Sequence, residues 1–150
     1  TSEIPERFKV SRGSRHLARR NAAQALYQWM VTGQGPGDIE SGFISDEALA
    51  GVDVDYFRHL ITQIPRYQRE LEDRLQAFAD RPLDRTDPVE RAIVLIGAYE
   101  ILFRPDIPPK AAIDQAVEVA HVFGAQDSYR FVNGLLDRLA ADRLAEGDTG

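Results

Sequence analysis

The sequence predicts an all-α protein with six or seven helices. In each long segment, apolar residues recur every three or four positions, and no segment shows the polar–apolar alternation that is typical of a strand. Breaks rich in glycine or proline, such as GQGPG at 33–37 and RPDIPP at 104–109, separate these segments. The 150 residues, 43% of them hydrophobic, suffice for one domain or for two small lobes that share a core.

The first helix is predicted to run from Ser14, a favourable N-cap residue, to the residue before Gly33. Residues 1–13 contain a proline and a glycine and show little periodicity, so we expect a flexible basic arm there. Beyond the glycine-rich break, residues 38–44 are expected to form a short helix.

A second long helix is predicted to begin near Asp53, because apolar residues follow it at spacings of three or four. These residues are Phe57, Leu60, Ile64, Tyr67, Leu71, Leu75 and Phe78. Pro65 lies inside the pattern, and a proline in mid-helix removes a backbone hydrogen bond. Because the spacing keeps its phase across Pro65, we favour one kinked helix over two abutting helices.

The segment RPLDRTD, residues 81–87, is the strongest internal boundary. A helix start follows it, in which Asp87 is expected to cap and Pro88 to take the first helical position. Glu90 stands where a capping-box acid belongs. The helix that follows is apolar on nearly every side, so we expect it to be central and buried.

Two more helices complete the predicted fold. One is expected over residues 109–123, with Gly124 after its end. The last is expected to begin near Asp127 and to end before Gly147.

The net charge of −6 hides an asymmetry along the chain. Residues 1–37 carry six cations and two acids, whereas residues 38–150 carry twelve cations and twenty-two acids. A positive end on an acidic body indicates a localised anion-binding surface, for which nucleic acid is a natural ligand. A solvated basic tail without a ligand is the alternative.

Helical geometry sorts the first helix into faces. The core side holds Ala18, Ala22, Ala25, Leu26 and Trp29. An outward stripe holds His16, Arg20, Ala23 and Tyr27, and the core face is flanked by Arg15 and Arg19. Guanidinium groups pair with phosphates and stack on bases, and a tyrosine ring can stack on an unpaired base. The stripe therefore favours RNA, with packing of Tyr27 against a neighbouring helix as the alternative.

The last helix carries a second unusual stripe. Its core face holds Val132, Leu135, Leu136 and Leu139. A different stripe holds Asp127, Phe131, Gly134 and Arg138. An aromatic residue near a glycine on the same stripe indicates either a ligand contact or, more commonly, close packing of another helix at Gly134.

The residues give no support for an enzyme. The chain has no cysteine, which excludes disulfides, thiolate zinc sites and a cysteine nucleophile. Asp114 and Glu118 share a helix face with Lys110, as an ordinary solvated charge ladder does, and His121 lies one turn beyond Glu118. These residues do not make a convincing set of three metal ligands. No phosphate-binding glycine loop or nucleophile elbow occurs in the sequence. We expect a non-catalytic protein that uses no metal and no cofactor. The longest apolar run, residues 92–99, is too short to cross a bilayer, and no secretory signal is visible, so we expect a cytoplasmic protein without membrane contact.

Several segments of the chain are familiar from one protein family. They are ARRNAAQALYQW (18–29), DYFRHL (55–60), DPVERAIVLIGAYEIL (87–102), IPPKAAIDQAVEVAHVFG (107–124) and AQDSYRFVNGLLD (125–137). On these segments the chain resembles the NusB family of bacterial transcription antitermination factors. The FVNG and LD residues, which follow a helix ending in FG, are the most specific of them.

The resemblance implies a fold and a function. The fold would be two packed three-helix bundles, which we place at residues 14–82 and 83–150. The function would be binding of the boxA segment of nascent RNA together with a ribosomal protein that acts as NusE. That complex would join RNA polymerase and other Nus factors and support ribosomal RNA transcription. The free protein would be either a monomer or a homodimer.

The resemblance also implies site residues, because the family's RNA-contacting positions fall on both stripes. By position, the family's RNA contacts fall on Arg15, Arg19, Tyr27, Asp127 and Phe131. The basic N-terminal stretch itself adds Arg12, His16 and Arg20 as candidate RNA-binding residues. Glu90 is assigned to the RNA or protein-partner surface. We expect both stripes to form one RNA-facing surface. The alternative is a helical protein–protein adaptor that binds no RNA and docks its basic helix on an acidic partner.

Overall fold

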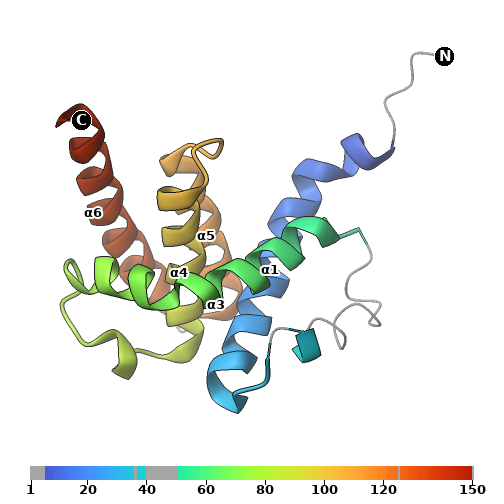
Figure 1. Cartoon of the computed structure of the whole chain (residues 1–150), viewed down its shortest axis with the longest axis horizontal. Coiled ribbons are helices and arrows are strands. Elements are labelled where there is room, and N and C mark those ends of the chain that lie inside the picture. The colour runs from blue at the N-terminus through green and yellow to red at the C-terminus, as the bar shows by residue number, and fades with distance from the viewer. Residues whose placement is uncertain (1–5, 36, 40–50, 125, 150) are drawn as a thin grey trace. The chain divides into compact units, whose positions relative to one another are not determined.

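The computed structural model describes residues 6–35, 37–39, 51–124 and 126–149, and within them the chain forms helices joined by turns and short loops. The elements are α1 (Glu6–Thr32), α3 (Val54–Gln76), the 3₁₀ turn η2 (Leu83–Arg85), α4 (Pro88–Phe103), α5 (Pro109–Phe123) and α6 (Ser128–Thr149), as Figure 1 shows. No strand occurs within these ranges, so the predicted all-α class is confirmed. Residues 37–39 are helical, and the rest of the expected 38–44 helix lies outside the described residues.

The chain divides into two compact units, one ending at Pro65 and the other beginning at Arg66. This division falls inside α3, which is a single helix that contains Pro65, as the phase of its apolar residues predicted. Each unit is described by itself below. The bundle boundary predicted between residues 82 and 83 stays a prediction.

Helix α1 begins earlier than the sequence indicated, at Glu6 instead of Ser14. The glycine at position 13 suggested a break, but one glycine costs a helix only about 1 kcal/mol relative to alanine, and the helix runs through it. The end of α1 is where it was predicted. Gly33 has a φ of 75°, and its N–H donates to the Trp29 carbonyl at 2.9 Å, which is a left-handed C-terminal cap.

In the first unit, the apolar stripes of α1 and of the first half of α3 are buried. The buried side chains are Ala18, Ala22, Ala25, Leu26, Phe57, Leu60, Ile61 and Ile64. Asp53 starts α3, because its Oδ1 atom accepts a hydrogen bond of 3.0 Å from the Tyr56 N–H. The predicted core face of α1 is confirmed except at Trp29, which is half-buried, and the predicted start of α3 is confirmed.

In the second unit, α4, α5 and α6 all contact one another (Figure 1). Helix α4 is the most buried of the three, as its apolar sequence predicted. Its start follows the prediction, since the Asp87 Oδ1 accepts from the Val89 N–H at 2.8 Å and Pro88 takes the first position.

The close approach between helices lies at Gly97 on α4. A Cβ atom added to Gly97 would overlap the side chain of Leu136 on α6, so the missing side chain lets the two helices touch. The more common interpretation of Gly134, a close helix contact, is wrong among the described residues. A Cβ atom there would meet only the Arg138 Nη1 atom, at 3.5 Å, which is an ordinary contact distance.

Candidate nucleic-acid interface

The outward stripe of α1 lies at the surface in part. Tyr27 is 39% exposed, so its ring is accessible and the alternative of tight packing against a helix is not supported. His16 and Arg20 are half-buried, and Ala23 is buried, so the stripe is less open at its centre than its spacing suggested. Arg12 belongs to α1, but its side chain lies outside the described part.

Two arginines of α1 lie over one aromatic ring of α3. The guanidinium carbons of Arg15 and Arg19 are 4.8 Å and 5.6 Å from the centroid of Tyr56. Tyr56 itself is buried, with 4% of its surface exposed. Cation–π contacts of this kind contribute about 0.5–2 kcal/mol each, depending on how far the cation is desolvated. The ring therefore holds two guanidinium groups in place and limits how far they can move.

The two arginines differ in what they can offer a ligand. Arg15 is half-buried, whereas Arg19 is only 7% exposed. Arg15 can thus present part of its guanidinium to a phosphate while it rests on Tyr56. Arg19 contributes mainly positive potential and packing in this arrangement, and its direct contact with RNA stays a prediction.

In the second unit, Phe131 lies beneath a guanidinium group. The Arg81 guanidinium carbon is 4.1 Å from the centroid of the Phe131 ring, which is half-buried. Asp127 is exposed immediately before α6, and its carbonyl accepts from the Arg130 N–H at 3.1 Å in the first turn. The ring of Phe131 therefore lies near the surface beneath the Arg81 side chain, instead of in the core.

Glu90 binds both Arg81 and Ser128, and its own side chain is nearly buried. Its Oε1 atom accepts a hydrogen bond of 2.9 Å from the Ser128 hydroxyl, and its Oε2 atom lies 3.5 Å from the Arg81 Nη2 atom. Glu90 thus directs its carboxylate to α6 and to the loop before η2, a tertiary role in place of the expected capping box. Its side chain is only 11% exposed, so Arg81 provides the accessible part of the pair.

Sequence reasoning missed Tyr56, Arg81 and Ser128. Tyr56 adjoins Phe57 but lies off the apolar stripe, and an aromatic residue off the core face is a signal that was available. Arg81 lies in the segment interpreted only as a boundary. Ser128 follows Asp127 directly, and nothing in its sequence context indicates a bond to Glu90.

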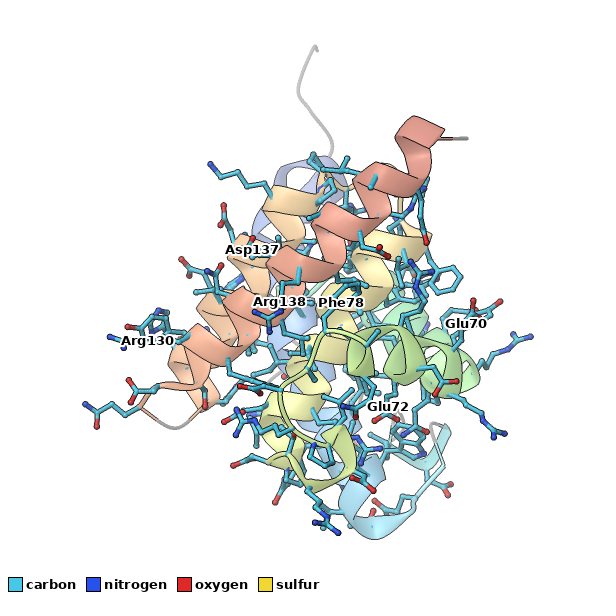
Figure 2. All side chains as sticks on the ribbon, turned by 90° about the vertical axis from the view of Figure 1, so that its left-hand side faces the viewer. Glu70, Glu72, Phe78, Arg130, Asp137 and Arg138 are labelled. Carbon is cyan, nitrogen blue, oxygen red and sulfur yellow. The ribbon has the colours of Figure 1, made fainter. Side chains whose placement is uncertain are left out.

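Other aromatic and titratable groups of the described residues make local contacts on α5 and α6. His121 stacks on Tyr129 with 4.5 Å between ring centroids, and the described residues contain no group of three or more metal-binding side chains. The Tyr129 hydroxyl accepts from the Arg130 Nε atom at 3.1 Å, and this hydrogen bond raises the pKa of Arg130. Figure 2 shows Arg130 projecting away from α6.

Within the described ranges, no helix is long and apolar enough to span a bilayer.

Comparisons with known proteins agree on one family. The model of the NusB family matches residues 16–141. The transcription antitermination proteins NusB of Shewanella pealeana and Shewanella oneidensis are each 46% identical over 127 residues, covering 85% of this chain and 94% and 95% of theirs.

Solved structures agree on the fold. A structure of the antitermination factors NusB and NusE in complex with dsRNA aligns with a TM-score of 0.79, at 23% identity, over 87% of this chain and 98% of that one. A structure of T. maritima NusB aligns with a TM-score of 0.71, at 26% identity, over 87% and 96%.

Proposed function

This chain belongs to the NusB family of transcription antitermination proteins, and we propose that it acts by binding boxA-type single-stranded RNA together with a ribosomal protein that serves as NusE. The observation that carries the proposal is that the Arg15 guanidinium of α1 lies over the Tyr56 ring of α3. The same helix α1 also exposes Tyr27. Together they combine a fixed cation for phosphate with an accessible ring for a base.

The chemistry of these groups favours unpaired RNA. A tyrosine ring can stack only on a base that has left its own stack, and sequence-specific RNA recognition mostly targets such single strands. Arginines position the phosphates but do not by themselves specify the sequence. The solved complex of NusB and NusE contains dsRNA, so the preference for single strands over duplex is part of what must be tested.

The proposal extends to partners and place. The two unusual stripes belong to different units of the chain, and we propose that they act on one RNA. The complex with NusE would join RNA polymerase and other Nus factors in the bacterial cytoplasm and support ribosomal RNA transcription. The chain would do so without catalysis, and homodimerisation of the free protein would compete with this assembly.

The test is a titration of the protein, with and without the ribosomal partner, against three labelled RNAs. These are boxA-type single-stranded RNA, a scrambled strand of the same composition, and boxA in a duplex. The proposal expects tightest binding to the single-stranded boxA RNA and a further gain with the partner present. Equal binding of the boxA and scrambled strands would contradict it and favour the protein–protein adaptor.

A further inference from the structure

The Arg81 guanidinium lies over the Phe131 ring at the surface of the second unit, outside the stripe that the sequence marked on α6. We propose that Arg81 is an RNA-contacting residue: the inner face of its guanidinium rests on Phe131, and its outer face receives an unpaired base. Glu90 acts on the RNA only through Arg81, as a positioning residue. This inference rests on the proposed function and names a further contact for it.

The stacking geometry explains why Arg81 matters for any ligand of Phe131. The guanidinium carbon lies over the ring at 4.1 Å from its centroid, which is a close cation–π contact. A base that approached this face of the ring would meet the guanidinium first. The Arg81 side chain is 49% exposed, so it still presents a planar surface to solvent. Guanidinium planes are among the surfaces on which unstacked RNA bases are held.

Side-chain hydrogen bonds fix the backbone at Arg81 and at the two residues that follow it. The Gln76 side chain donates to the Arg81 carbonyl at 3.1 Å and accepts from the Leu83 N–H at 2.9 Å. The Thr86 hydroxyl donates to the Pro82 carbonyl at 3.1 Å, and Leu83 is buried. These bonds fix where the Arg81 side chain leaves the loop.

A second fastening comes from α6. The Arg138 Nε atom donates to the Phe78 carbonyl at 3.0 Å, and Figure 2 shows this side chain reaching from α6 toward the loop at Phe78. The loop with Arg81 and the helix with Phe131 are thereby tied to each other by a contact separate from the stacked pair. The relative position of guanidinium and ring is therefore set in advance of binding, which reduces the entropy lost when a ligand binds.

The guanidinium itself is held by Glu90. The Oε2 atom of Glu90 lies 3.5 Å from the Arg81 Nη2 atom, while Ser128 holds the other carboxylate oxygen. The exposed Asp80, at 3.9 Å from the Arg81 Nε atom, adds little because surface ion pairs are weak. Because Glu90 already balances the positive charge of Arg81, we expect Arg81 to contribute more through stacking than through phosphate neutralisation.

The ligand class follows from this chemistry. A flat face with a balanced charge suits an uncharged planar group, which in RNA is the nucleobase. Stacking on such a surface tolerates any base. The inference therefore concerns where one base of the bound strand lies, and it leaves the choice of that base to other contacts.

The test uses the full chain with single-stranded RNA in which 2-aminopurine replaces one base at a time, because the fluorescence of this analogue falls when it stacks. The variants are Arg81→Ala, Arg81→Lys and Glu90→Gln, with Arg85→Ala as a matched loss of charge from the neighbouring exposed turn. Thermal unfolding of each variant separates loss of fold from loss of contact.

The inference expects one RNA position that is quenched by the wild type and no longer quenched by Arg81→Ala or Arg81→Lys. Both variants should bind about fivefold or more weakly, with the slope of affinity against salt nearly unchanged. Glu90→Gln should lose part of the quenching while it keeps an acceptor for Ser128. Arg85→Ala should quench like the wild type.

Two results would overturn the inference. One is Arg81→Lys binding and quenching like the wild type, because charge alone would then suffice. The other is Arg81→Ala binding and quenching like the wild type, because then no base stacks on the side chain of residue 81. Since stacking tolerates any sequence, both comparisons hold on any strand that the wild type binds. Equal binding of boxA and scrambled RNA would refute the proposed function alone, and no binding of either would refute both.

Discussion

The guanidinium of Arg15 on α1 lies 4.8 Å from the centroid of Tyr56 on α3, and the ring is almost fully buried. A buried ring thus orients a cation at the edge of the surface. Without it, the arginine side chain would lose more rotamer freedom on binding RNA. The basic helix is therefore not simply a charged strip, because part of its charge is placed by a residue from another helix.

Replacement of Tyr56 should show whether RNA binding depends on the aromatic ring or on the hydroxyl group. Tyr56→Phe keeps the aromatic face and should bind RNA like the wild type, whereas Tyr56→Leu should bind severalfold more weakly. Because Tyr56 is buried, Tyr56→Leu will also lower the unfolding temperature. Phe57→Leu, at a buried neighbour, controls for lost stability. If both leucine variants bind equally well in a filter or polarisation assay, Tyr56 does not orient the arginines.

The two arginines on Tyr56 should respond differently to removal. Arg15→Ala should weaken RNA binding and reduce the slope of log affinity against log salt by about 0.7, the value for one phosphate contact on a single strand. Arg19→Ala should change the slope less and lower the unfolding temperature more, because Arg19 is 7% exposed. The double variant should show the flattest salt dependence. An unchanged slope in the double variant would remove both residues from the RNA contact.

Phe131→Ala should lower RNA affinity without unfolding the protein. The ring is half-buried and carries Arg81 on its face, so its loss should cost less than the roughly 3–5 kcal/mol of a fully buried phenylalanine. Circular dichroism against temperature measures the stability, and RNA titration measures the affinity. A large fall in the unfolding temperature of this variant, with wild-type RNA affinity at temperatures where it is still folded, would place the ring in the core instead.

Replacement of Gly97 and replacement of Gly134 should have opposite effects on stability. Gly97→Ala forces a methyl group into Leu136, which is itself fully buried, and should destabilise the protein by about 1–3 kcal/mol. Gly134→Ala meets only the end of Arg138 and should be neutral or stabilising by up to about 1 kcal/mol, since alanine favours helix. Urea unfolding of both variants compares them directly. A Gly134→Ala variant as unstable as Gly97→Ala would contradict the assignment of the close contact to Gly97.

Tyr99 predicts a loss of stability at alkaline pH. Burial raises the pKa of its hydroxyl above the ordinary value of 10.0, and the nearby Arg104 offsets part of this rise. The unfolded chain therefore releases this proton at lower pH than the folded chain, so the free energy of unfolding should fall as pH rises above about 10. Tyr99→Phe should reduce that fall, and Tyr27→Phe, at an exposed ring, should leave it in place. Equal alkaline profiles for Tyr99→Phe and the wild type would refute this origin.

The sequence predicted those parts of the fold that depend on neighbours along the chain. The spacing from Phe57 to Leu75 correctly gave a single α3 across Pro65, and Asp87 and Gly33 correctly marked helix ends. The start of α1 was missed because Gly13 was given too much weight as a breaker, although one glycine opposes a helix only weakly.

The site was less accessible to sequence reasoning because its decisive contacts join distant segments. Arg15 and Tyr56 come from different helices, and Arg81 and Phe131 from a loop and a helix. Periodicity assigns a residue to a face of its own helix, but it does not say which side chain from elsewhere will cover that face. For the same reason Glu90 was assigned to a surface, whereas Ser128 and Arg81 hold it in a nearly buried position.

The Gln76 side chain binds the carbonyl of residue 81 and the N–H of Leu83, main-chain groups that are present whichever amino acid stands at position 81. Replacement of Arg81 should therefore keep the path of the loop and remove mainly the contacts with Phe131 and Glu90. The loop thus separates two tasks, because Gln76 sets the path of the main chain while the side chain at position 81 remains available for a ligand.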